Sequence, residues 1–182
     1  MQARRLDQRD EQWFTGMYAA HYPDIIRYGI RRLADLDAST ELAQEVFEVA
    51  WRRRSEVPDN SLPWLYGVAR RLLANRWRAR RTHPPVDSLA DAGVIQATDA
   101  SEPTSIAGIA DLHAAMARLS EIDREILRLV GWEQLTVAEA AIVLGSTRTA
   151  AKVRLHRARR RLAALLTMSV PTTAPLPATA RG

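Results

Sequence analysis

Basic side chains recur along residues 148–161 at the spacing of an α-helix, and they are the clearest sign of chemistry in this sequence. Arg148, Lys152, His156 and Arg159 would line one flank of such a helix. In the major groove of DNA, arginine and lysine pair with the O6 and N7 atoms of guanine, and elsewhere they bind backbone phosphates. The pattern therefore predicts a DNA-binding helix whose N-terminal turns, with Arg148 and Lys152, lie nearest the bases.

The residues before this helix complete a helix-turn-helix. Thr136 and Glu139 have the spacing of a capping box, in which each side chain accepts a hydrogen bond from the other residue's backbone N–H. Gly145 suits the left-handed end of a short helix, and Ser146 is the expected cap of the next one. A core face on the second helix is made by Ala151, Leu155, Ala158, Leu162 and Leu165. The alternative is a basic amphipathic helix on any small bundle, which the order of these signals disfavours.

No catalytic or metal-binding constellation is visible. The 182 residues include no cysteine, and the four histidines (His21, His83, His113 and His156) lie far apart. Neither a metal, a cofactor nor an enzymatic activity is therefore predicted. No apolar run approaches the ~20 residues of a membrane span, and the N-terminus is polar. We therefore expect a cytoplasmic protein without direct membrane insertion.

Charge and periodicity together predict an all-α fold, in which two small helical domains are joined by a flexible acidic linker. Residues 1–82, with 15 basic and 11 acidic side chains, would form the first domain. Residues 83–107, with four acidic side chains and no Lys or Arg, would form the linker. Residues 108–166, with 10 basic and 6 acidic side chains, would form the second domain. Residues 167–182, with three prolines, would form a disordered tail.

Four helices are expected in the first domain. Proline suits the first turn of a helix, so Pro23 and Pro63 are each expected to begin one. A short turn is expected at residues 35–39. With these limits, the helices would cover residues 7–22, 23 to about 33, 40–54 and 63 to about 81.

Two of these helices carry contrasting surfaces. Glu41, Gln44, Glu45 and Glu48 form an acidic stripe that would suit a basic protein partner and not DNA. Residues 64–81 instead interleave aromatic and arginine side chains, a composition that holds unstacked bases and their backbone. Ordinary core packing explains the aromatic residues of that second helix about as well.

In these segments the sequence resembles the extracytoplasmic-function (ECF) sigma factors of bacterial RNA polymerase, from Trp13 to about Leu166. Residues 41–47 resemble the helix of that family that docks on the polymerase, residues 64–70 its promoter-melting helix, and residues 119–162 its upstream-element reader. The resemblance implies a first domain that docks on a coiled coil of the largest polymerase subunit. It also implies that this domain opens the minus-ten element and captures a flipped non-template base in a pocket made by the loop of residues 55–62 and the following helix. The second domain would bind the minus-thirty-five element as duplex DNA.

The resemblance assigns three sets of site residues. The core-polymerase set is Glu41, Leu42, Gln44, Glu45, Phe47 and Glu48. The minus-ten set is Asn60, Trp64, Tyr66, Arg70, Arg71, Asn75, Arg76 and Arg78. The minus-thirty-five set is Arg148, Thr149, Lys152, Val153, Arg154, His156 and Arg157.

The sequence departs from the family pattern at Gly67, Arg71 and residues 149–151, so the promoter sequence is not carried over from relatives. The expected partners are core RNA polymerase, promoter DNA and an anti-sigma factor. A one-component helix-turn-helix regulator, with residues 1–82 as a dimerisation or sensing module, is the second hypothesis.

Overall fold

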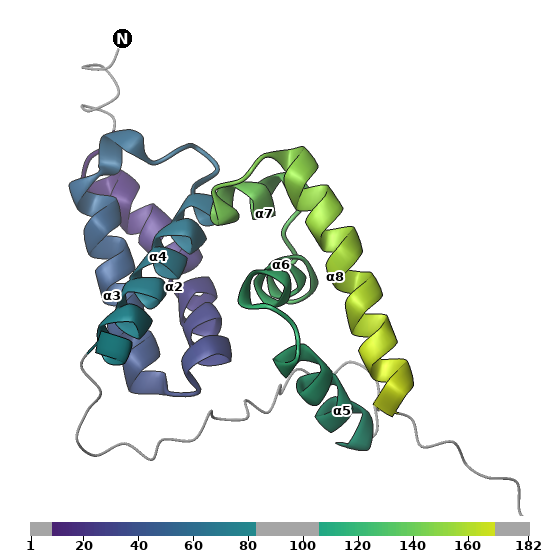
Figure 1. Ribbon diagram of the computed structural model, residues 1–182. Coiled ribbons are helices and arrows are strands. Elements are labelled where there is room, and N and C mark those ends of the chain that lie inside the picture. The colour runs from purple at the N-terminus through teal and green to yellow at the C-terminus, as the bar shows by residue number, and fades with distance from the viewer. Residues whose placement is uncertain (1–8, 83–105, 170–182) are drawn as a thin grey trace, which may run out of the picture.

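The computed structural model describes residues 9–82 and 106–169, which form helices and no strand, so the all-α prediction is confirmed. The predicted linker lies almost wholly outside these residues. Figure 1 shows two groups of helices, which we call the first and second units. The first unit contains α2 (Glu11–Leu33), α3 (Leu36–Arg52), the 3-10 turn η1 (Arg54–Glu56) and α4 (Ser61–Thr82). The second unit contains α5 (Ile106–Ala117), α6 (Glu121–Gly131), α7 (Val137–Leu144) and α8 (Arg148–Ser169).

Helix α2 runs unbroken through Pro23, so the expected start of a new helix at that proline is wrong. A proline inside a helix removes a hydrogen bond and costs about 3 kcal/mol. Apolar packing on both sides offsets this cost, since Met17 and Ile25 are buried in the core. The helix begins after the cap Asp10 and ends at Leu33, and the C-cap Ala34 that follows has a left-handed backbone.

Helix α3 begins four residues earlier than expected, because Asp35 caps it by accepting a hydrogen bond from the backbone N–H of Ala38 at 2.9 Å. The expected turn at residues 35–39 is therefore wrong, and the helix also ends at Arg52 and not at residue 54. Helices α2 and α3 cross closely at Gly29. A Cβ atom placed on Gly29 would lie 2.8 Å from the Cβ of Ser39 and 3.1 Å from its Cα.

This crossing makes Gly29→Ala an informative substitution. We expect it to lower the free energy of unfolding by about 1–3 kcal/mol, because the backbone of α3 has to move away. The matched control is Gly16→Ala, in the same helix, where an added Cβ meets nothing within 4 Å. That variant should gain about 0.5–1 kcal/mol from helix propensity. Urea denaturation followed by circular dichroism measures the free energy of unfolding of both variants. An equal gain in that free energy for Gly29→Ala and Gly16→Ala would refute the close crossing.

The helix-turn-helix forms as predicted, with one difference. Thr136 and Glu139 make the capping box, and Gly145 ends α7 in the left-handed conformation with φ of 63°. The cap of α8 is Thr147 and not Ser146, since the Thr147 hydroxyl accepts from the backbone N–H of Ala150 at 3.2 Å. Helix α8 also continues to Ser169, so residues 167–169 are helical and do not belong to a disordered tail.

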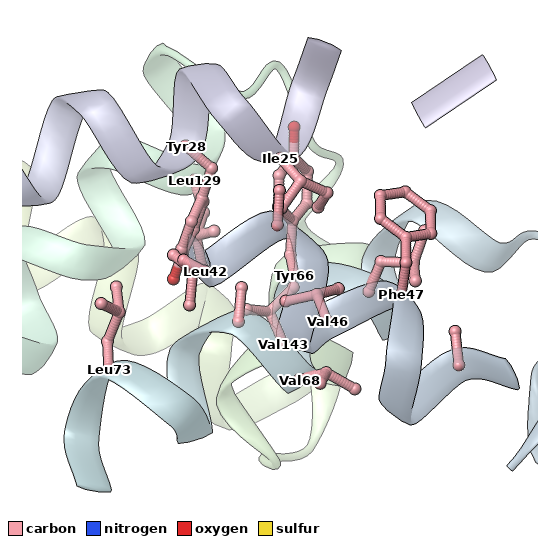
Figure 2. Close-up of a cluster of buried hydrophobic side chains, with 14 of the residues drawn as sticks. Ile25, Tyr28, Leu42, Val46, Phe47, Tyr66, Val68, Leu73, Leu129 and Val143 are labelled. Carbon is pink, nitrogen blue, oxygen red and sulfur yellow. The ribbon is translucent and has the colours of Figure 1, made fainter. Parts of the chain in front are cut away.

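The two units share one hydrophobic core. Leu129 and Leu135, with Ala140 and Val143 of α7, belong to the same cluster as Tyr28, Leu65 and Tyr66 of the first unit. Figure 2 shows Leu129 and Val143 among side chains of that unit. A Cβ on Gly67 of α4 would lie 3.8 Å from the Cα of Val143, so α4 and α7 pack closely. Separately, Ile126, Ala141, Ala151, Leu155 and Ala158 form a smaller cluster within the second unit.

Candidate nucleic-acid and protein interfaces

The N-terminal half of α8 presents a basic surface to solvent. Its core face is held by Ala151, Leu155 and Ala158, which are at most 4% exposed. The opposite side is free for a ligand, and six residues of the predicted minus-thirty-five set are exposed there without an ion pair: Arg148, Thr149, Lys152, Val153, His156 and Arg157. The structure therefore brings these residues together on one face, as a helix in the major groove requires.

Arg154, the seventh residue of that set, has a structural partner. Its Nη1 lies 3.3 Å from the Asp123 carboxylate, which also accepts from Arg161. Asp123 is 2% exposed, whereas the two arginine side chains are 42% and 62% exposed. The carboxylate thus ties α6 to α8 and sets the angle of the basic helix. Sequence reasoning missed this role because α6 and α8 share no local pattern.

The acidic stripe on α3 is exposed at Glu41, Gln44 and Glu48 and half-buried at Glu45. Glu45 accepts a hydrogen bond from Arg76 of α4 at 2.7 Å, so part of its charge is compensated within the unit.

Two residues of the predicted docking set do not reach the surface. Leu42 and Phe47 are 0% and 2% exposed and lie in the core, so their assignment to direct contact with the polymerase is corrected. Leu42 and Phe47 lie on the inner face of α3, whereas the residues of the acidic stripe lie on its outer face.

Helix α4 shows the same division between core and surface. Tyr66 is 2% exposed and packs on Tyr28 with ring centroids 5.1 Å apart, so it is not a surface contact for DNA in this arrangement. Burial raises the pKa of the Tyr66 phenol, which stays uncharged. Trp64 and Trp77 are half-buried against the core, which agrees with the packing alternative for both.

The polar residues of α4 are more accessible. Arg71, Asn75 and Arg78 are exposed, Arg70 and Arg76 are half-buried, and Asn75 accepts a hydrogen bond from Arg78 at 2.7 Å. At the start of the helix, the Asn60 amide donates to the Glu139 carboxylate of α7 at 3.0 Å. Hydrogen bonds from Thr136 and Asn60 hold the pKa of Glu139 below its ordinary value. The Asn60 side chain is therefore already hydrogen-bonded to the second unit.

A buried polar network joins the two units beside the shared core. The Tyr28 hydroxyl lies 3.0 Å from Glu125, and the Arg32 guanidinium donates to Glu125 at 3.0 Å and to Glu133 at 3.0 Å. Arg31 adds a second contact to Glu133 at 2.8 Å. The side chains of Arg32 and Glu133 are 1% and 2% exposed. Nothing in the local sequence pairs residues about a hundred positions apart, so sequence reasoning missed this network.

Among the described residues, no helix is both long enough and apolar enough to cross a membrane. The same residues contain no group of three or more His, Cys, Asp or Glu side chains arranged to hold a metal ion.

The fold and its surfaces define a protein of two packed helical units, the second a helix-turn-helix with a basic, exposed second helix. Comparison with known families agrees. Residues 17–83 match the family model described as sigma-70 region 2, and residues 109–162 match sigma-70 region 4. The ECF RNA polymerase sigma factor SigF of Caulobacter vibrioides is 33% identical over 140 residues, which are 75% of each chain. The chain belongs to the ECF sigma factors of the sigma-70 family.

Two further proteins are similar to this chain, but the matches cover very different shares of their own lengths. The "Probable RNA polymerase sigma factor RfaY" of Xanthomonas campestris is 34% identical over 132 residues, but these cover only 33% of that relative. The solved structure of the sigma factor RpoE from Bartonella quintana, in complex with the anti-sigma factor NepR, matches with a TM-score of 0.64 and 22% identity. The match covers 86% of this chain and 98% of the RpoE chain, and it shows a likeness of fold.

Proposed function

We propose that this chain is an alternative sigma factor that binds core RNA polymerase and directs initiation at specific promoters. The observation that carries the proposal is the combination of an exposed basic recognition helix in one unit with an exposed acidic stripe in the other. Both lie in segments that match sigma-70 regions. The chain itself would act in the cytoplasm as an initiation factor and not as an enzyme.

The exposed surfaces of α3, α4 and α8 suggest which residues make the proposed contacts. Glu41, Gln44, Glu45 and Glu48 would face the coiled coil of the largest polymerase subunit, because an acidic stripe complements a basic partner. Residues 1–82, with the exposed polar side chains of α4, would bind the minus-ten element, and residues 108–166 would bind the minus-thirty-five element through α8. The partners therefore include promoter DNA.

Promoter opening through Asn60 requires its exposed hydrogen bond to Glu139 to break. A contact of Tyr66 with DNA would require the packing around it to open, because Tyr66 is buried in the shared core. An anti-sigma factor is proposed as a further partner, supported by the likeness of fold to the sigma factor RpoE, whose structure was solved in complex with the anti-sigma factor NepR.

Reconstituted transcription with core polymerase and a genomic promoter library tests this function. We expect specific initiation that depends on the chain, together with weak DNA binding by the chain alone. A one-component regulator would instead bind a palindrome tightly as a dimer. Such binding without specific initiation would overturn the proposal in favour of that alternative.

The exposed position of Lys152 on α8 allows a sharper test of promoter reading. If its ammonium group contacts a base, Lys152→Ala should lose about 1–3 kcal/mol at one position of the upstream element and little elsewhere. Arg160→Ala, an exposed residue two turns further along α8, is the matched control and should weaken all sequences equally. The rate of transcription initiation from promoters with single-base changes measures the effects of both substitutions. A uniform loss with Lys152→Ala would assign that residue to a phosphate.

A further inference from the structure

Arg9 is a buried charged residue at the edge of the first unit. It lies just before α2 and outside residues 17–83, which match the sigma-70 region 2 model, yet its side chain is only 8% exposed. The guanidinium lies over the ring of Trp13, 5.0 Å from the ring centroid. An arginine is taken out of water in this way only where several acceptors surround it.

The acceptors belong to the loop between α3 and α4. Nη1 donates to the carbonyl oxygen of Arg54 at 2.6 Å and to that of Val57, and Nη2 donates to Asp59 at 3.2 Å. The two carbonyls stand at the beginning of η1 and just after its end, where the chain leaves helical geometry. Arg9 therefore joins three points of residues 54–59, a segment about 50 positions away in the sequence.

The backbone contacts outweigh the ion pair. The Asp59 side chain is 94% exposed, and a salt bridge in water contributes little. The carbonyl of Val57, in contrast, belongs to a residue that is 2% exposed, and a buried carbonyl without a donor is costly. The planar guanidinium is suited to bind several oxygens at fixed angles. Asp10, the N-cap of α2, holds the neighbouring backbone in place.

We propose that Arg9 is a positioning residue for promoter opening, which holds residues 54–59 in the shape that receives an unpaired base of the non-template strand. This role rests on the proposed function, because the loop precedes Asn60 and α4, the proposed minus-ten surface. Arg9 does not touch the base itself. It acts through the backbone of the loop, from a part of the chain that lies before the matched family segment.

The test compares full-length variants in complex with core polymerase. Arg9→Ala should slow open-complex formation about tenfold, equivalent to about 1.4 kcal/mol, as measured by permanganate reactivity of unpaired thymines. Its affinity for core polymerase should remain that of the parent chain. Arg9→Lys, which keeps a donor for the two carbonyls, should recover part of the rate, and Asp59→Asn should have a small effect. Arg27→Ala is the control for loss of charge, since Arg27 is exposed on α2 and pairs only locally with Asp24.

A promoter with a pre-opened minus-ten bubble separates positioning from general stability. Arg9→Ala should lose preference for the base at the captured position even on this template, because the loop that receives it has changed shape. Opening at the parent rate, or a loss of polymerase binding that matches the loss of opening, would overturn the role of Arg9. If the parent chain fails to initiate at all, the proposed function fails instead.

Discussion

Replacement of Arg32 by alanine is expected to lower the free energy of unfolding by about 3–5 kcal/mol. The Arg32 side chain is 1% exposed and binds Glu125 and Glu133 across the boundary between the units. Without its guanidinium, the buried Glu125 carboxylate loses its ion pair with Arg32, whereas Glu133 keeps its contact with Arg31. Urea denaturation of the full chain, followed by circular dichroism, measures the loss.

A second, half-buried arginine provides the contrast. The Nε of Arg128 has no hydrogen-bond partner, and burial, with a further contribution from Arg32, lowers its pKa to about 10. Removal of this charge by Arg128→Met is therefore expected to raise the free energy of unfolding. The combination of Arg32→Met and Glu125→Gln should recover much of the loss, because Glu125 is then neutral and Glu133 keeps its ion pair with Arg31. Similar losses for Arg32→Ala and Arg128→Met would contradict a specific role for Arg32.

Leu129→Ala is expected to cost about 2–5 kcal/mol and to loosen both units together. Leu129 belongs to α6 but is 0% exposed in the cluster that contains Tyr28, Leu65 and Tyr66 of the first unit. The cavity left by its side chain would lie at the boundary between the units. Hydrogen exchange of the native protein should therefore accelerate in α4 as well as in α6.

Ile126→Ala is the matched control for that measurement. Ile126 precedes Leu129 on the same helix and is also 0% exposed, but it packs within the second unit against Ala141, Ala151 and Leu155. Its loss should accelerate exchange in α6–α8 and leave α4 protected. If Leu129→Ala leaves the amides of α4 as protected as in the parent chain, the shared core is not what holds the units together.

Local signals in the sequence were sufficient for the helix-turn-helix. A capping box needs only Thr136 and Glu139 three positions apart, and a left-handed helix end needs only Gly145, so neighbouring residues decide both. Helical spacing also separated the core face of α8 from its basic surface. The acidic stripe on α3 was predictable for the same reason, because helical geometry alone places its members on one side.

Tertiary packing decided the features that depend on residues far apart in the chain. Pro23 stays inside α2 because the core on both sides outweighs the local penalty, and Tyr66 is buried in the core that α4 shares with α2 and α7. The partners of Arg9 and Arg32 come from other elements, so no pattern of neighbours indicates them. The sequence by itself determined which helices form and which of their faces are polar. Only the packing of the two units determined which of those polar groups are free to bind, because burial depends on the whole fold.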